Sequence, residues 1–338
     1  MSDVEFTLNG IYSTMQSSDA YSGRLVYYGD VTGDDMQAVS STKRVANYYR
    51  FNFTKDDNPS SHWSYLYSII QNCNLILMNI DKLVIDEDDK AYRDDLKGEA
   101  LAIRGLALFD LTRIFGYPYL KDNGASLGVP IIEGLSTIDS KPTRNTVAQC
   151  YTKIIDDLTQ SLSLLGEKFN KGKINKWGAM VLLSRVYLYK GENANALKMA
   201  SDAIIGAEKN KYALWTNEDY PTAWGEDASA SKPGEVLFEI VNLTTDSPGK
   251  ESMGYLNSYD GYDDMCITCS FYQFLKEDPK DIRLKLLSFD KKYYAYVTEY
   301  QLQREENIED ANIPLIRLSE AYLNAAEAAV KELSLIHI

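Results

Sequence analysis

The sequence predicts a mostly α-helical protein, in which tetratricopeptide-like helical hairpins form a scaffold with long irregular loops and a few short strands. Three observations predict this class. Apolar residues recur at helical spacing, three helices share a wide apolar face with an embedded arginine, and one glycine turn joins two helices. We expect a single domain over residues 1–338. Its scaffold is expected at about 59–116, 146–207 and 312–331.

The first part of the scaffold contains the stretch "AIRGLALFDLTRIFGYPYL", which is apolar on nearly every side. A helix of this kind is normally covered by other elements all round, so we expect it to be the inner member of a stacked pair. Gly116 and Pro118 predict its end, because glycine permits a turn and proline cannot continue a helix. We expect Arg104 and Arg113 to pair with neighbouring acids or to cap carbonyl groups.

The second part begins where Thr146 and Gln149 stand in the register of a capping box. Further along, "WGAMVLLSRVYLYKG" ends at Gly191 and is followed by "ENANALKMASDAIIGA". The second of these helices carries small residues at 196, 200 and 203, which favour the close helix approach of stacked hairpins.

The third part is the segment "LIRLSEAYLNAAEAAV", which has the same character as the two earlier apolar helices. Its polar stripe of Arg317, Glu320, Asn324 and Glu327 indicates ion pairs and hydrogen bonds between packed helices. Long insertions at about 20–58 and 212–262 interrupt the scaffold, and "GEVLFEIVN" within the second predicts a strand. Loops on a rigid scaffold are where binding sites usually lie, so both insertions are expected to face a ligand.

Composition excludes several classes of function. With 35 basic and 49 acidic residues, the chain has a net charge of −14, which repels nucleic acid and anionic lipid. Two histidines, His62 and His337, give no support to a Ser-His-Asp triad, and the sequence contains no glycine-rich phosphate loop. We therefore expect a binding protein without enzymatic activity or a cofactor. A structural calcium ion is left open, although no acidic stretch matches the twelve-residue calcium loop.

The motifs of the scaffold resemble those of the SusD/RagB family of nutrient-binding proteins. The resemblance lies in an arginine-containing helix that ends in Phe-Gly-x-x-Pro, then Gly-x-Pro, then a Tyr-x-x-Ile-x-x-Asp-Leu helix. The matching residues here are Arg104, Phe115, Gly116, Pro118, Gly128, Pro130, Tyr151, Ile154, Asp157 and Leu158. "INKWGAMVLLSRVYLYKGENANAL" and "IPLIRLSEAYLNAAEAAV" are similar to two further segments of the family.

The resemblance implies a non-catalytic lipoprotein on the bacterial cell surface. Such proteins are anchored in the outer membrane, bind oligosaccharides, and deliver them to a TonB-dependent transporter. Some branches of the family bind peptides, so a peptide ligand is an alternative. This sequence shows no signal peptide or lipid-bearing cysteine near its start, so anchoring is implied by the resemblance only. The family pattern also continues beyond the "AEAAV" helix, from which we expect a truncated C-terminus.

A sugar site requires flat aromatic rings against the pyranose faces and polar groups for the hydroxyls. Three loops combine such residues without a helical or strand period. The candidates for ligand binding are Asp35, Arg44 and Tyr48, then Trp215, Tyr220 and Trp224, and finally Tyr255, Asn257, Tyr259 and Tyr262.

A second hypothesis from the helical pattern alone is a tetratricopeptide-like adaptor whose concave surface binds another protein. Aromatic side chains on the long loops favour a small ligand, whereas aromatic side chains along the inner surface of the hairpins favour a partner peptide. The pair Cys266 and Cys269 forms a lone C-x-x-C, and the sequence does not decide whether the two are bonded.

Overall fold

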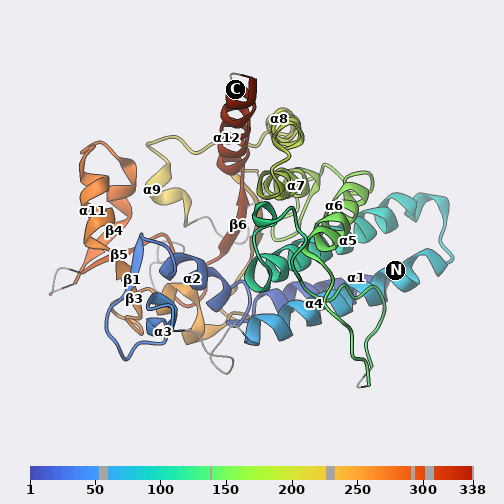
Figure 1. The fold of residues 1–338 in the computed structure, drawn as a ribbon, viewed down its shortest axis with the longest axis horizontal. Helices are drawn as coiled ribbons and strands as arrows, with labels where there is room; N and C mark the ends of the chain where they lie inside the picture. Colours follow the sequence, from blue (N-terminus) through green and yellow to red (C-terminus); the bar gives the residue numbers. More distant parts are fainter. Residues whose placement is uncertain (53–59, 138, 226–232, 291–293, 301–307, 337–338) are drawn as a thin grey trace.

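The computed structural model of the chain describes residues 1–52, 60–137, 139–225, 233–290, 294–300 and 308–336 (Figure 1). Helices dominate and strands are short, which confirms the predicted class. The helices are α1 (Ser2–Met15), α2 (Arg24–Val31), α3 (Ala46–Tyr49), α4 (Ser60–Asn79), α5 (Lys90–Phe115), α6 (Val147–Leu162), α7 (Lys176–Lys190), α8 (Asn193–Lys209), α9 (Tyr220–Ala223), α10 (Met253–Leu256), α11 (Cys269–Lys276) and α12 (Leu318–Ile336). The strands are β1 (Met36–Ala38), β2 (Val236–Ile240), β3 (Met265–Ile267), β4 (Leu287–Phe289), β5 (Ala295–Val297) and β6 (Ile313–Arg317).

The long helices form one continuous stack. In the order α1, α4, α5, α6, α7, α8 and α12, each helix packs against the next. Figure 1 shows this scaffold on one side of the molecule, while α3, α9, α11 and the strands β1, β3, β4 and β5 gather on the other. Within the described residues, no helix combines the length and apolar character that a membrane span requires.

Helix α5 lies inside the stack, as its apolar composition predicts. Every residue from Gly98 to Thr112 is buried, because α4 covers one face of the helix and α6 covers another. The N-terminus of α6 has the predicted capping box between Thr146 and Gln149, in which each side chain bonds the other residue's backbone N–H.

Arg104 of α5 is held in a buried network. Its guanidinium donates two hydrogen bonds to the carboxylate of Asp157, at 2.8 and 2.7 Å, and one to Asn74 Oδ1 at 2.8 Å. This network joins α4, α5 and α6 where Asp157 has no contact with water. Arg113 pairs with Asp110 on its own helix, so both arginines have the acidic partners expected from the sequence.

Helices α7 and α8 approach one another closely enough to require small residues. Ala196, Ala200 and Ala203 are fully buried on α8. An added Cβ at Gly206 would lie 2.1 Å from the ring of Trp177, so only glycine fits there. The turn between the helices uses Gly191 with a φ of +81°, a left-handed conformation that glycine adopts without strain.

The strands form three separate antiparallel pairs, β1–β3, β2–β6 and β4–β5. Strand β2 confirms the strand predicted for "GEVLFEIVN", and its partner comes from a segment that the sequence predicts to be helical. The sequence predicts that Ile313–Arg317 belong to the third part of the helical scaffold. In the structure they form β6, and α12 begins only at Leu318. The apolar run with Pro314 pairs with β2 because the tertiary partner outweighs the helical period of the following residues. The insertion at 20–58 likewise contains α2, β1 and α3 in addition to loops.

The Arg104 network predicts a large and specific loss of stability. Arg104→Ala removes the bidentate partner of buried Asp157, which retains an ion pair with Lys153 at 3.1 Å, and we expect the free energy of unfolding to fall by about 3 kcal/mol. The matched control is Lys198→Ala, which removes an exposed i,i+4 pair with Asp202 and should cost less than about 0.5 kcal/mol. Urea denaturation of both variants measures the difference. Equal losses would contradict a structural role for the buried network.

Candidate functional site

Three of the predicted aromatic residues form one cluster beside α9. The rings of Trp215, Tyr220 and Trp224 meet edge to face, with centroid separations of 6.1, 5.0 and 5.6 Å. The guanidinium of Arg317 on β6 lies over this cluster, 4.8 Å from the Trp224 ring and 5.7 Å from the Trp215 ring. Trp224 is only 7% exposed, so Trp215 and Tyr220 form the more accessible part of the cluster.

Local capping and one buried carboxylate hold this cluster in place. The hydroxyl of Thr216 accepts a hydrogen bond from the backbone N–H of Asp219 at 3.1 Å, which starts the turn into α9. Glu235 accepts from the backbone N–H of Trp215 at 2.9 Å and pairs with Arg317 at 3.3 Å. The loop is therefore bound to strand β6.

A cavity of about 200 Å³ adjoins the cluster. Tyr220 and Asn257, both predicted site residues, line it together with groups from α2, α11 and the β4–β5 hairpin. The amide Oδ1 of Asn257 is buried and has no hydrogen-bond donor among the described residues. In Figure 1 the cavity's elements lie on the side of the molecule away from the main helical stack.

Two carboxyl groups, those of Asp30 and Glu299, also line this cavity. Burial, together with repulsion from Asp30, raises the pKa of Glu299 to about 7. Burial and repulsion from Asp35 raise the pKa of Asp30 to about 6, although the side chain retains solvent contact. A carboxyl group that is partly protonated near neutral pH both donates and accepts hydrogen bonds, as a ligand hydroxyl does.

A second cluster contains three further predicted residues. The guanidinium of Arg44 lies 3.7 Å from the ring centroid of Tyr262, and Tyr262 contacts Tyr255 edge to face at 5.0 Å. Arg44 also pairs with Asp264 at 3.5 Å and Glu251 at 3.6 Å. These contacts occupy Arg44 with protein groups.

The remaining predicted residues have separate positions. Tyr48 is buried against Tyr27 and Tyr28, at centroid distances of 6.0 and 5.4 Å, and belongs to the core. Tyr259 is exposed, and Asp35 is exposed where its carbonyl accepts a hydrogen bond from the backbone of Thr268. The structure thus brings Trp215, Tyr220, Trp224 and Asn257 to one region. Asp35 lies near enough to Asp30 of the cavity to repel it, and the other candidates lie elsewhere or face inward.

The sequence does not identify Asp30 and Glu299 as site residues. It predicts that Arg317 forms contacts between packed helices and does not predict its place beside the aromatic cluster. No local signal identifies the two carboxyl groups, because they come together from segments about 270 residues apart in the sequence. In the part of the chain that the structure describes, no group of three or more His, Cys, Asp or Glu side chains could hold a metal ion. Cys266 and Cys269 are both free thiols.

Comparison with known proteins identifies a family with the same architecture. A SusD-like family model, described as starch-binding and associating with the outer membrane, matches residues 2–188, more than half of the chain. A crystal structure of a candidate sugar-binding protein from Bacteroides vulgatus is 82% identical, with a TM-score of 0.95 over 98% of this chain and 74% of that one.

Two further solved structures share the fold. A SusD superfamily protein from Bacteroides thetaiotaomicron is 36% identical with a TM-score of 0.91, over 98% of this chain and 76% of that one. A laminarin-binding SusD-like protein is 18% identical with a TM-score of 0.79, over 97% of this chain and 80% of that one. The curated relatives, SusD-like proteins of Bacteroides ovatus and Formosa agariphila, match over only 23% and 39% of their own length.

The raised pKa of Glu299 predicts a pH-dependent stability. A carboxyl group whose pKa rises on folding costs stability as the pH increases from its ordinary value of 4.5 to about 7. Glu299→Gln removes this titration, so its stability relative to the wild type should increase across that range, by on the order of 1 kcal/mol because solvent contact reduces the effect.

Urea denaturation below pH 4.5 and above pH 7 measures this change. Glu277→Gln, an exposed substitution just after α11, is the matched control and should show no comparable trend. A difference between Glu299→Gln and the wild type that stays constant with pH would contradict the inferred environment of Glu299.

Proposed function

Because the chain belongs to the SusD-like family of starch-binding proteins that associate with the outer membrane, we propose that it captures oligosaccharides at the cell surface without chemical conversion. The observation that carries this proposal is the cluster of Trp215, Tyr220 and Trp224 beside a cavity whose largely apolar wall contains a few polar groups. Such a pairing of flat apolar faces with a few fixed polar groups suits a sugar.

Affinity would come from two sources. The aromatic cluster offers ring faces and edges against which the apolar face of a pyranose packs. In the adjoining cavity, Asp30, Asn257 and Glu299 provide oxygen atoms that accept hydrogen bonds from sugar hydroxyls. The carboxyl groups oppose a negatively charged sugar in this cavity, and Arg283, which also lines it, is already paired with Asp281, so the ligand proposed for this site is a neutral glycan.

Delivery to a membrane transporter is part of the same proposal. The family description associates these proteins with the outer membrane, and a glycan binder there serves uptake if it releases its ligand to a channel. We propose a TonB-dependent transporter as that partner and a lipid anchor as the link to the membrane. Reversible binding without bond cleavage suits such a carrier, because the ligand must be released intact.

Isothermal titration against neutral glucans and against peptides tests the proposed function. Starch fragments and laminarin oligosaccharides represent α- and β-linked glucans, and a peptide mixture represents the alternative ligand. Saturable heat with at least one glucan, with no cleavage products, is the expected result. Binding confined to peptides would replace the glycan by the peptide alternative, and carbohydrate cleavage would contradict the proposal.

Substitution of the aromatic rings locates the site. Trp215→Ala and Tyr220→Ala should each weaken glycan binding by about 1–2 kcal/mol, from lost ring contact and buried area, which is roughly five- to thirty-fold in Kd. Tyr117→Ala, at an exposed tyrosine outside the cluster, is the matched control and should bind as the wild type does. Unchanged affinity in both cluster variants would show that the glycan binds elsewhere.

A further inference from the structure

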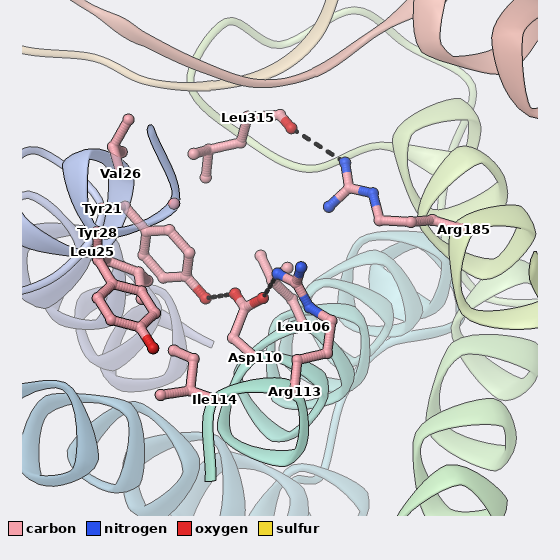
Figure 2. Close-up of a pocket in the computed structure, with 11 residues that line it drawn as sticks. Tyr21, Leu25, Val26, Tyr28, Leu106, Asp110, Arg113, Ile114, Arg185 and Leu315 are labelled. Atoms are coloured by element: carbon pink, nitrogen blue, oxygen red, sulfur yellow. Dashed lines mark hydrogen bonds and ion pairs between the residues drawn. The ribbon is translucent and has the colours of Figure 1, made fainter. Parts of the chain in front are cut away.

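A second cavity, of about 280 Å³, lies between α2, α5, α7 and β6 (Figure 2). Two arginines line it, Arg113 from α5 and Arg185 from α7, whereas the first cavity is lined by one arginine, Arg283, and two carboxyl groups. Apolar side chains of α2, α5 and β6 form the rest, including Leu25, Leu106 and Leu315. The cavity therefore combines positive charge with an apolar surface.

The one carboxylate in this wall already accepts a hydrogen bond on each of its oxygens. Asp110 is almost fully buried, and the hydroxyl of Tyr21 donates to its Oδ2 at 2.7 Å. Its Oδ1 accepts the ion-paired hydrogen bond from Arg113 (Figure 2). Asp110 is thus engaged on both oxygens, and its ion pair with Arg113 offsets part of its charge.

The arginines, in contrast, retain donor capacity. Arg185 Nε and Nη2 bind the carboxylate of Glu320 at 2.5 and 2.6 Å, and Nη2 also reaches the carbonyl of Leu315 at 3.3 Å. Nη1 has no hydrogen-bond acceptor among the described residues and points toward the middle of the cavity (Figure 2). Arg113 Nη1 has only a long hydrogen bond of 3.4 Å, to the hydroxyl of Tyr189.

The charge of the wall therefore opposes that of the whole chain. Two guanidinium groups and one carboxylate line this cavity, whereas the chain carries a net charge of −14. Arg113 and Arg185 also interact electrostatically, so a shared anion would relieve the repulsion between them. Two positively charged groups with N–H donors to spare can bind an anion that accepts hydrogen bonds from both.

We propose that this cavity is a second binding site, separate from the aromatic cluster, which takes the carboxylate of a small ligand such as a uronic acid residue. The carboxylate would accept hydrogen bonds from Arg185 Nη1 and Arg113, and the apolar wall would contact the carbon-rich face of the ligand. A peptide's terminal carboxylate has the same chemistry and is the other possible source.

Gly29 provides a way to test the cavity without breaking its ion pairs. Arg185→Gln would leave Glu320 without its bidentate partner and could unfold the protein. Gly29 lines the cavity in the helical backbone of α2, and an added Cβ there meets no atom within 4 Å. Gly29→Glu places a competing carboxylate at the cavity without a clash. Gly10→Glu on α1 has equally open surroundings and is the matched control for charge and helix propensity.

Binding of sodium glucuronate, glucose and N-acetylglycine to the wild type and both variants should be measured by titration calorimetry. We expect glucuronate to bind about tenfold more tightly than glucose, because charged hydrogen bonds are roughly twice as strong as neutral ones. Gly29→Glu should bind glucuronate about tenfold more weakly than the wild type does, and Gly10→Glu should bind it with wild-type affinity. Added salt should weaken the binding.

Glucuronate and N-acetylglycine, the two probes with a carboxylate, distinguish a sugar acid from a peptide terminus as the natural ligand. Tighter binding of glucuronate than of N-acetylglycine supports a sugar acid, and the reverse order supports a peptide terminus. Equal affinity of the wild type for glucuronate and glucose would overturn the proposal. It would also fail if Gly29→Glu bound glucuronate as well as Gly10→Glu does. Trp215→Ala should leave glucuronate binding intact, so failure at one site is distinguishable from failure at the other.

Discussion

The buried carboxylate of Glu235 joins the loop that contains Trp215 to the helical scaffold. It stands at the start of β2 and accepts hydrogen bonds from the backbone of Trp215 at 2.9 Å and from the hydroxyl of Ser319 at 2.6 Å, besides its ion pair with Arg317. A charge that is only 3% exposed is tolerated because these donors surround it. One side chain thereby fixes the aromatic loop, strand β6 and the start of α12 relative to each other.

Strand β6 and helix α2 position both cavities. On β6, Leu315 lines the arginine-walled cavity and Arg317 lies over the aromatic cluster. On α2, Gly29 lines the arginine-walled cavity and Asp30 lines the one beside the cluster. The two cavities therefore share their framework, although different side chains of β6 and α2 contribute to each.

The sequence predicts the scaffold well because helical spacing and capping are local signals. The buried stretch of α5, the capping box at Thr146 and the turn at Gly191 all follow from residues close to each other in the chain. Strand β6 could not be predicted, since its conformation depends on pairing with β2, about 75 residues earlier. For the same reason, the sequence named Tyr220 and Asn257 as candidates but could not show that they line one cavity with Glu299.

Residue type alone also fails to separate structural arginines from those available to a ligand. Arg104 and Arg113 lie in one helix, and the sequence gives both the same expectation of an acidic partner. In the structure, Arg104 donates through all three of its nitrogen atoms to Asn74 and Asp157. The arginines of the second cavity have N–H donors that bind no acceptor among the described residues or bind one only at long distance, above all Nη1 of Arg185. The hydrogen-bonding capacity left after folding, which only the tertiary arrangement determines, is therefore the property that separates a structural ion pair from a binding group.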